Sequence, residues 1–196
     1  HANICQFSKP YSEQVALINA LMDPQVETVV VLKPRQIGMT TVNCADTFWA
    51  TFTARKPLRT IVATDHNKTT KSIFGKFCNY YHYLPRALQS SNPFLINKND
   101  KTLISERTGA LIDHMTARGD THGRGWTYQR VVAEELAYWP HAQDTWGALT
   151  ATQHEGPDSQ TIIISTPNGP GDFYHEKVLA AQEAERSGDL RTRFLF

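Results

Sequence analysis

The sequence has few of the features that mark several common protein classes. Its 196 residues include 3 cysteines, which are too widely spaced for a disulfide framework or a zinc site: Cys5, Cys44 and Cys78. No charged-then-apolar signal segment opens the chain, and no apolar stretch approaches the roughly 20 residues of a membrane-spanning helix. These absences favour a globular protein of a reducing cytoplasm, with no membrane partner.

The net charge is also small. Lys and Arg number 20 and Asp and Glu number 19, a balance of +1 that gives no sign of a nucleic-acid partner. The charges are nevertheless segregated, because residues 33–86 carry nine basic and two acidic residues, whereas residues 132–196 carry four and ten. Two solvated faces are the usual explanation. The alternative is a phosphate-binding half and a carboxylate-bearing half of one site.

Short β-branched runs alternate with helical stretches, and at roughly 100–200 residues per domain the length fits one domain. Strands are predicted at Thr28–Leu32 and at residues 60–64, 102–105, 110–115, 130–133 and 161–165, the third and fourth forming a hairpin. Helices are predicted at Ser12–Met22 and at residues 40–53, 68–83, 144–152 and 173–187, and residues 191–196 could begin a further strand. The alternation predicts a mostly parallel sheet with helices on both faces, whose ligands bind at the carboxyl ends of the strands.

The loop after the first predicted strand, KPRQIGMTT, partly matches a phosphate-binding loop. In the usual pattern, GxxxxGK followed by Ser or Thr, Gly38 and Thr40 fit. Lys33 takes the place of the first Gly and Met39 takes the place of the Lys. An ordinary polar strand-to-helix loop is the alternative interpretation.

The chemistry of this loop favours phosphate binding. Backbone N–H groups at a helix start can bind an anion, and the hydroxyl of Thr40 or Thr41 can bind Mg²⁺. Met39 cannot supply the cation that the phosphates need, so Lys33 or Arg35 would have to supply it.

Two adjacent carboxylates, Glu134 and Glu135, follow the apolar strand at residues 130–133. A buried carboxylate without a partner is costly, and a hydrated Mg²⁺ would compensate. One carboxylate would hold the water shell of the ion and the other would orient or deprotonate the attacking water. An exposed acidic pair at a helix start is the alternative.

Two weaker signals surround these motifs. Ser165, Thr166 and Asn168 follow the strand at residues 161–165 and could sense a γ-phosphate, although Pro and Asn-Gly alone indicate only a turn. Tyr11 and Gln14 precede the first strand, and together they could stack on an adenine and hydrogen-bond it. The alternative interpretation of Gln14 is an ordinary surface residue of a helix.

A Gly-rich basic loop at residues 118–126 precedes the strand that ends in the two carboxylates. It could carry an arginine finger, or it is simply a loop. The eight histidines show no ligand spacing, so His114, His122 and His154 are interpreted as structural.

The order of these motifs resembles the ATPase domain of the large terminase subunit of tailed bacteriophages, the motor that packages viral DNA. KPRQIGMTT is similar to the family's "RQxGKT" loop, in the variant with the lysine at the loop start. VVAEELAYWP resembles the family's apolar strand followed by "DEAA", and STPNG resembles its coupling motif. RGW, with Arg124, resembles the "RG" before the acidic strand.

The resemblance covers nearly all of the chain. It implies an α/β P-loop NTPase of the ASCE type, a three-layer α/β/α fold with a mostly parallel sheet, over residues 1–196. Roughly the last 15–20 residues are alternatively the start of a linker subdomain, and the family's nuclease domain is expected to be absent.

The resemblance also implies a role for each candidate residue. The implied catalytic residues are Glu135, Arg124, Lys33 and Arg35. The implied nucleotide-binding residues are Tyr11, Gln14, Lys33, Pro34, Arg35, Gln36, Ile37, Gly38, Met39, Thr40 and Thr41. Ser165, Thr166 and Asn168 would couple hydrolysis to movement or sense the γ-phosphate. Thr40 and Glu134 would hold the metal.

The implied cofactors are ATP and Mg²⁺. The implied partners are double-stranded DNA, the portal protein, the small terminase subunit and further copies of the chain in a ring on the portal, with a monomer as the isolated state, in the host cell cytoplasm. Two other functions are consistent with the same residues. One is a superfamily 2-like nucleic-acid helicase, and the other is a nucleotide-binding module whose degenerate phosphate loop is inactive.

Overall fold

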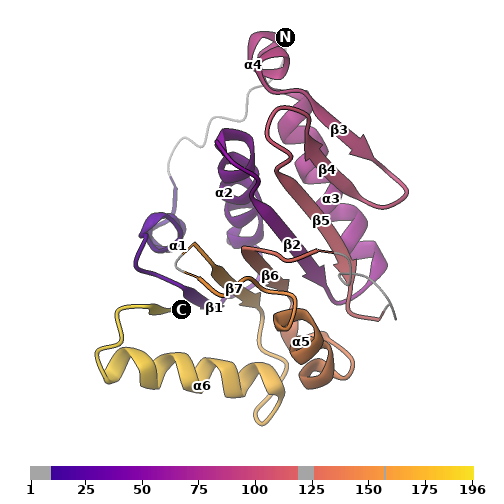
Figure 1. Ribbon diagram of the computed structural model, residues 1–196. Coiled ribbons are helices and arrows are strands. Elements are labelled where there is room, and N and C mark those ends of the chain that lie inside the picture. Colours follow the sequence, from indigo (N-terminus) through magenta and orange to yellow (C-terminus); the bar gives the residue numbers. More distant parts are fainter. Residues whose placement is uncertain (1–9, 119–125, 157) are drawn as a thin grey trace.

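A single eight-stranded sheet organises the chain. The computed structural model describes residues 10–118, 126–156 and 158–196 (Figure 1). The strand order is β3-β4-β5-β2-β6-β7-β1-β8. Pairing is antiparallel at β3/β4 and β4/β5 and parallel across the rest of the sheet, which is therefore mostly parallel as predicted.

The strands run over short segments rich in β-branched residues. They are β1 Thr28–Leu32, β2 Arg59–Thr64, β3 Phe94–Asn97, β4 Thr102–Ser105, β5 Leu111–Thr116, β6 Arg130–Glu134, β7 Gln160–Ser165 and β8 Thr192–Leu195. The helices are α1 Ser12–Met22, α2 Met39–Thr53, α3 Asn67–His82, α4 Arg86–Ser91, α5 Ala142–Thr150 and α6 Phe173–Arg186, with a 3₁₀ turn η1 at Leu136–Tyr138.

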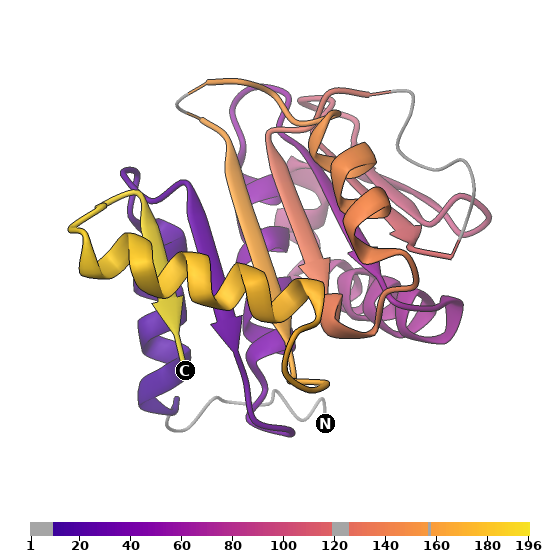
Figure 2. The same cartoon turned by 90° about the horizontal axis from the view of Figure 1, so that it is seen from below.

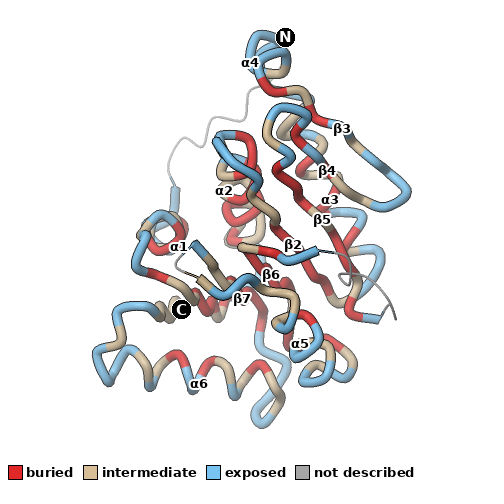
Figure 3. Tube along the Cα trace, in the orientation of Figure 1, coloured by how far each residue is buried: buried red, intermediate tan, exposed pale blue. Residues whose placement is uncertain are grey.

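Helices cover both faces of the sheet, because alternate side chains of each strand point to opposite faces. In β1, Val29 and Val31 pack with α1, α2 and α3, whereas Val30 packs with η1, α5 and α6 on the other face. Figure 2 shows α5 and α6 in front of the sheet, and Figure 3 shows that the central strands are buried. The result is the predicted three-layer α/β/α arrangement.

The structure differs from the sequence-based expectation in a few segments. The predicted hairpin exists, but β3 extends it to three antiparallel strands at the edge of the sheet. Helix α4 has no buried residue and therefore no apolar periodicity by which to predict it. Strand β8 forms within the suggested segment and pairs with β1. No helix in the described ranges is long and apolar enough to cross a membrane.

The parallel alignment brings the polar residues after several strands to one edge of the sheet. Strand β7 lies between β1, which precedes the polar loop, and β6, which ends in the acidic pair. A strand inserted between these two is the arrangement of the ASCE type of P-loop NTPase. The topology thus places the loop, the carboxylates and the STPN segment beside one another.

His114 on β5 is a buried ionisable residue away from this edge. Its ring lies 5.4 Å from the Phe74 ring and 5.1 Å from the Phe77 ring, measured between centroids. Nδ1 lies 2.7 Å from the carbonyl oxygen of Lys101, and Nε2 is buried with no hydrogen-bond partner among the described residues. Burial lowers the pKa of His114 from 6.5 to about 4, although the Lys101 carbonyl opposes this shift. The folded protein therefore holds a neutral imidazole.

We expect His114 to make the protein less stable in mild acid. Between pH 6.5 and pH 4 the unfolded chain binds a proton that the folded chain excludes, so the free energy of unfolding falls as pH falls through this window. The expected contribution is about 3 kcal/mol. Urea unfolding of the wild type and of His114→Asn at pH 7 and pH 4 measures it. The Asn variant should lose less stability on acidification, and equal losses would contradict the assignment.

Candidate functional site

The loop between β1 and α2 has the backbone geometry of an anion-binding turn. Gln36 and Gly38 adopt positive φ angles of 67° and 75°, and α2 begins directly afterwards at Met39. The first N–H groups of a helix have no partner within the helix. The turn therefore presents the N-terminal end of α2, with its partial positive charge, at the carboxyl edge of the sheet.

The Gln14 side chain holds the backbone of this turn by a hydrogen bond. Its Nε2 donates a hydrogen bond to the carbonyl oxygen of Ile37 (2.8 Å), and its Oε1 accepts one from the backbone N–H of Tyr11 (3.1 Å). A Cβ atom at Gly38 would lie 2.9 Å from Gln14 Nε2. Position 38 thus requires glycine for its backbone angle and for the space that the Gln14 amide fills.

Met39, at the usual position of the phosphate-loop lysine, packs into the hydrophobic core. Its side chain is 2% exposed and belongs to the apolar cluster that includes Leu17 and Val42. A cation at position 39 would lie among apolar side chains. The only lysine of this loop is Lys33.

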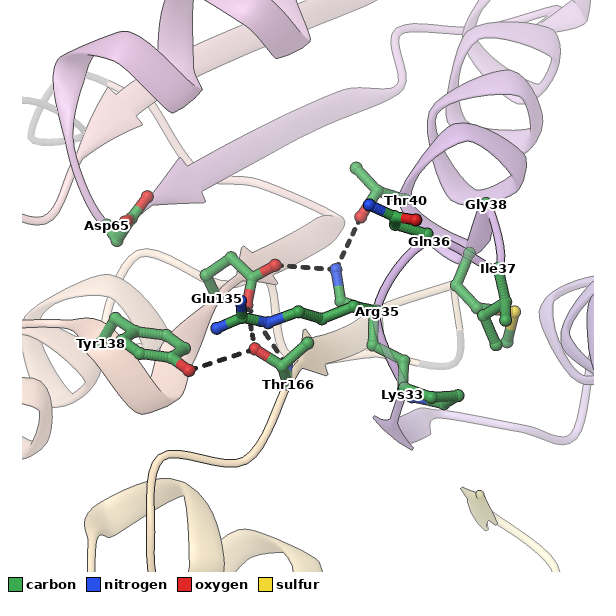
Figure 4. Close-up of a pocket in the computed structure, with 12 residues that line it drawn as sticks. Lys33, Arg35, Gln36, Ile37, Gly38, Thr40, Asp65, Glu135, Tyr138 and Thr166 are labelled. Atoms are coloured by element: carbon green, nitrogen blue, oxygen red, sulfur yellow. Dashed lines mark hydrogen bonds and ion pairs between the residues drawn. The ribbon is translucent and has the colours of Figure 1, made fainter.

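Lys33 lies at the centre of a buried polar cluster at the end of β1. Its ammonium nitrogen, Nζ, lies 2.8 Å from Thr40 Oγ1, 2.9 Å from Glu135 Oε1 and 3.7 Å from Glu134 Oε2 (Figure 4 shows the first two contacts). The Lys33 side chain is 9% exposed. One cation therefore neutralises both members of the acidic pair in part.

Glu134, the last residue of β6, is completely buried. Its Oε2 accepts a hydrogen bond from Thr40 Oγ1 (2.9 Å), and its Oε1 accepts a longer one from Asn43 Nδ2 (3.4 Å). Burial raises the pKa of Glu134 to about 7; the Lys33 ammonium and the Thr40 hydroxyl oppose the rise, and Glu135 adds to it. The carboxylate is thus held in a site that favours a nearby positive charge.

Glu135 leaves the strand in an unusual conformation. Its φ of 57° is rare for a residue with a side chain, and it turns the chain from β6 into η1. The Oε2 atom accepts hydrogen bonds from the Thr166 N–H (3.2 Å), Thr166 Oγ1 (3.3 Å) and Ser165 Oγ (3.4 Å). Its two oxygens therefore face different partners, Lys33 on one side and the segment after β7 on the other.

The segment after β7 also contacts η1. The Tyr138 hydroxyl accepts a hydrogen bond from Thr166 Oγ1 (3.3 Å) and donates one to the Pro167 carbonyl oxygen (3.2 Å). Asn168 Nδ2 donates to the Ala137 carbonyl oxygen (3.2 Å). A displacement of Glu135 would therefore be transmitted to this segment through several hydrogen bonds.

A cavity of about 480 Å³ opens beside the cluster. Its lining joins the loop after β1 to the segments that follow β2, β6 and β7: Lys33, Pro34, Arg35, Gln36, Ile37, Gly38, Met39, Thr40, Asp65, Glu135, Tyr138 and Thr166. The Arg35 side chain points toward Glu135 (Figure 4). The volume, the helix N-terminus and the two basic side chains suit a polyphosphate ligand.

Asp65 is a residue of the cavity that the sequence motifs did not identify. It follows β2, whose Thr64 is paired with Glu134 on β6, and its Oδ2 contacts His66 Nδ1. Its Oδ1 is buried with no hydrogen-bond partner within the described parts of the chain. Like Glu134, Asp65 is an acidic residue at the end of a core strand, and this position in the sequence would identify it as well.

Some predicted residues lie outside this cavity. Tyr11 is exposed, and the Gln14 amide is engaged with the loop backbone. Thr41 faces α3, where Lys76 Nζ lies 3.3 Å from its Oγ1, so Thr40 is the hydroxyl that faces the carboxylates. Arg124 lies outside the described residues. Adenine binding by Tyr11 and Gln14, and the finger role of Arg124, stay predictions.

The sheet order and the loop geometry together define the fold of an α/β P-loop NTPase. The acidic pair lies beside the loop, where Glu134 accepts a hydrogen bond from Thr40 and Glu135 contacts Lys33. No family model matches the sequence, and no curated protein matches it.

Solved structures of phage large terminases share this fold at low sequence identity. The large terminase of bacteriophage HK97 superposes with a TM-score of 0.78 at 17% identity over 99% of this chain. The large terminase ATPase domain of Thermus phage P74-26 gives 0.68 at 17% identity over 87%. The large terminase of a thermophilic bacteriophage, in complex with ATP-γ-S, gives 0.64 at 12% over 95%.

The match covers part of these proteins. The chain spans 40% of the HK97 terminase, 70% of the P74-26 ATPase domain and 45% of the ATP-γ-S-bound terminase. The shared region contains the loop, the acidic strand and the segment after β7, since nearly the whole of this chain superposes on the HK97 protein.

We expect Gly38→Ala to destabilise the loop. The substitution forces a Cβ into a left-handed conformation and against the Gln14 amide, and should lower the free energy of unfolding by about 1–2 kcal/mol. Gly75→Ala in α3 is the matched control, because a Cβ there meets no atom within 4 Å and alanine favours a helix. Thermal unfolding of both variants compares them. A Gly38→Ala protein as stable as Gly75→Ala would contradict the proposed constraint.

Proposed function

We propose that this chain is the ATP-hydrolysing motor domain of a viral DNA-packaging terminase, and that it couples ATP hydrolysis to the movement of double-stranded DNA into a procapsid. The observation that carries the proposal is the cluster of Lys33, Thr40, Glu134 and Glu135 beside a cavity at a helix N-terminus. The likeness to large terminase structures supports it.

The phosphates of ATP would bind at the N-terminal end of α2. The N–H groups from Gly38 to Thr41 have no helical partner and suit the phosphate oxygens. Lys33 and Arg35 supply the positive charge that Met39 cannot supply. The terminase of the thermophilic bacteriophage was crystallised with ADP and with ATP-γ-S, which supports a nucleotide in a cavity of this fold.

The oxygen atoms of the cluster fit a magnesium ion. Thr40 Oγ1 and Glu134 Oε2 lie 2.9 Å apart and are hard oxygen donors, the type that Mg²⁺ prefers. The described residues contain no group of three or more His, Cys, Asp and Glu side chains that could hold a metal without the phosphates, and Mg²⁺ is ordinarily shared with substrate phosphates. When bound, the ion would neutralise the charge that develops on the transferred phosphoryl group.

Glu135 would orient and deprotonate the water that attacks the γ-phosphorus. Its carboxylate lines the cavity, and Ser165 and Thr166 fix one of its oxygens. Movement of Glu135 after phosphate release would reach η1 and the STPN segment through Tyr138 and Thr166. This connection is the proposed route from hydrolysis to movement of the domain.

The partners are proposed by analogy with the structural neighbours and from the sequence motifs. A DNA-packaging motor protein is among the structures that share the fold, at a TM-score of 0.50. We propose that copies of the chain form a ring on the portal protein in the host cytoplasm. There they would act with the small terminase subunit and double-stranded DNA, and Arg124 would complete the site of a neighbouring copy.

We expect Glu135→Gln to abolish ATP hydrolysis while nucleotide binding persists. The amide keeps the size of the side chain but cannot accept a proton, so turnover should fall on the order of 100-fold or more. Phosphate release and fluorescent ATP binding measure the two properties, with magnesium and double-stranded DNA present. Glu106→Gln, an exposed residue, is the matched control and should leave both unchanged.

The same experiment separates the other candidate functions. Unchanged turnover in Glu135→Gln would refute the assignment of the catalytic base. ATP binding without turnover in the wild type, over a range of protein concentrations and with DNA and portal supplied, would indicate a nucleotide-binding module. Unwinding of a duplex, rather than movement along it, would favour the helicase.

Subunit mixing tests the role of Arg124. We expect Arg124→Ala and Glu135→Gln to be inactive alone, because each removes one half of a shared site, and an arginine finger typically contributes on the order of 1,000-fold. A mixture of the two proteins should recover phosphate release, since some interfaces then contain both an intact Glu135 and an intact Arg124. No recovery, although both proteins bind nucleotide, would contradict action between subunits.

A further inference from the structure

The ammonium of Lys33 makes two close polar contacts and one longer ion pair within the protein. A lysine has three N–H donors, and three oxygens lie around this nitrogen: Thr40 Oγ1, Glu135 Oε1 and, at 3.7 Å, Glu134 Oε2. A phosphate in the cavity would compete with these three oxygens for the ammonium. In the observed position Lys33 is engaged mainly with the side chains of the protein, and close contact with phosphates would draw it away from them.

A divalent metal would compete for the same oxygens. Mg²⁺ binds oxygen at about 2.0–2.1 Å, so an ion on Thr40 and Glu134 would lie against an ammonium that already contacts both residues. The two cations would repel each other at this distance in a buried site. Space and charge thus allow one of them between these oxygens at a time.

The Lys33 side chain also borders the cavity, which offers a second position for its ammonium. It lines the 480 Å³ cavity as well as the cluster, so its nitrogen can move toward a ligand in the cavity by side-chain rotation. Phosphates bound at the N-terminal end of α2 would attract it there. Its departure would leave Glu134, a fully buried carboxylate, in need of another cation.

We propose that Lys33 is a placeholder for the metal: its ammonium occupies the site formed by Thr40, Glu134 and Glu135 in the nucleotide-free protein and leaves when phosphates and a divalent cation enter together. The proposal rests on the metal site of the proposed function. It predicts that nucleotide-free protein discriminates against divalent cations, and that Lys33 sets this discrimination.

Binding of Mn²⁺ without nucleotide, followed by electron paramagnetic resonance, tests the proposal. The wild type should bind Mn²⁺ weakly, whereas Lys33→Met should bind it about tenfold more tightly or better, because the oxygens are then free. Lys76→Met is the matched control: it removes the same charge from a lysine that contacts the neighbouring Thr41, and should bind Mn²⁺ like the wild type. Thr40→Val in the Lys33→Met background should abolish the gain.

Equal Mn²⁺ affinity in the wild type and Lys33→Met would overturn the proposal, as would an equal gain in Lys76→Met. If Lys33→Met does not fold, amine labelling of the wild type, read by peptide mass, decides the question. High Mn²⁺ should then raise the labelling of Lys33 and leave that of Lys76 unchanged, and no rise at Lys33 overturns the proposal. Neither measurement involves hydrolysis, so a protein with no ATPase activity can still confirm the metal site.

Discussion

The contact between one ammonium and two carboxylates is the interaction on which the site depends. Glu134 is fully buried and Glu135 is partly so, and two negative charges on adjacent residues would repel each other without a cation between them. Lys33 supplies that cation from the end of a strand two positions away in the sheet. The sheet order, the loop after β1 and the position of Thr40 together bring these groups into contact.

A second constraint connects the first helix to the loop. The Gln14 amide holds the Ile37 carbonyl and fills the space that a larger residue at position 38 would need. Residues that are far apart in the sequence thus fix the angle at which α2 begins. The Gln14 hydrogen bond thus helps to orient the N-terminal end of α2, which has no side-chain cap of its own.

The core strands and the edge at which the polar residues collect could be predicted from the sequence, because buried strands carry β-branched runs and parallel strands align their ends. The loop, Thr40 and the acidic pair were found in the same way. The short edge elements α4 and β3 were not, since α4 has no buried residue and β3, with four residues, is too short for its alternation to stand out. The sequence left Lys33 and Arg35 as the two candidate cations, and the choice of Lys33 as the one that faces the carboxylates depends on the direction in which each side chain leaves the loop.

The burial of Met39 has an evolutionary consequence. A lysine introduced at this position would enter the apolar cluster around Leu17 while Lys33 still filled the site, so the single step toward the common phosphate-loop pattern adds a buried, uncompensated charge. A return would need the core, the loop start and the lysine to change together. A stepwise change between the two arrangements of the lysine therefore passes through a variant that we expect to be less stable than either.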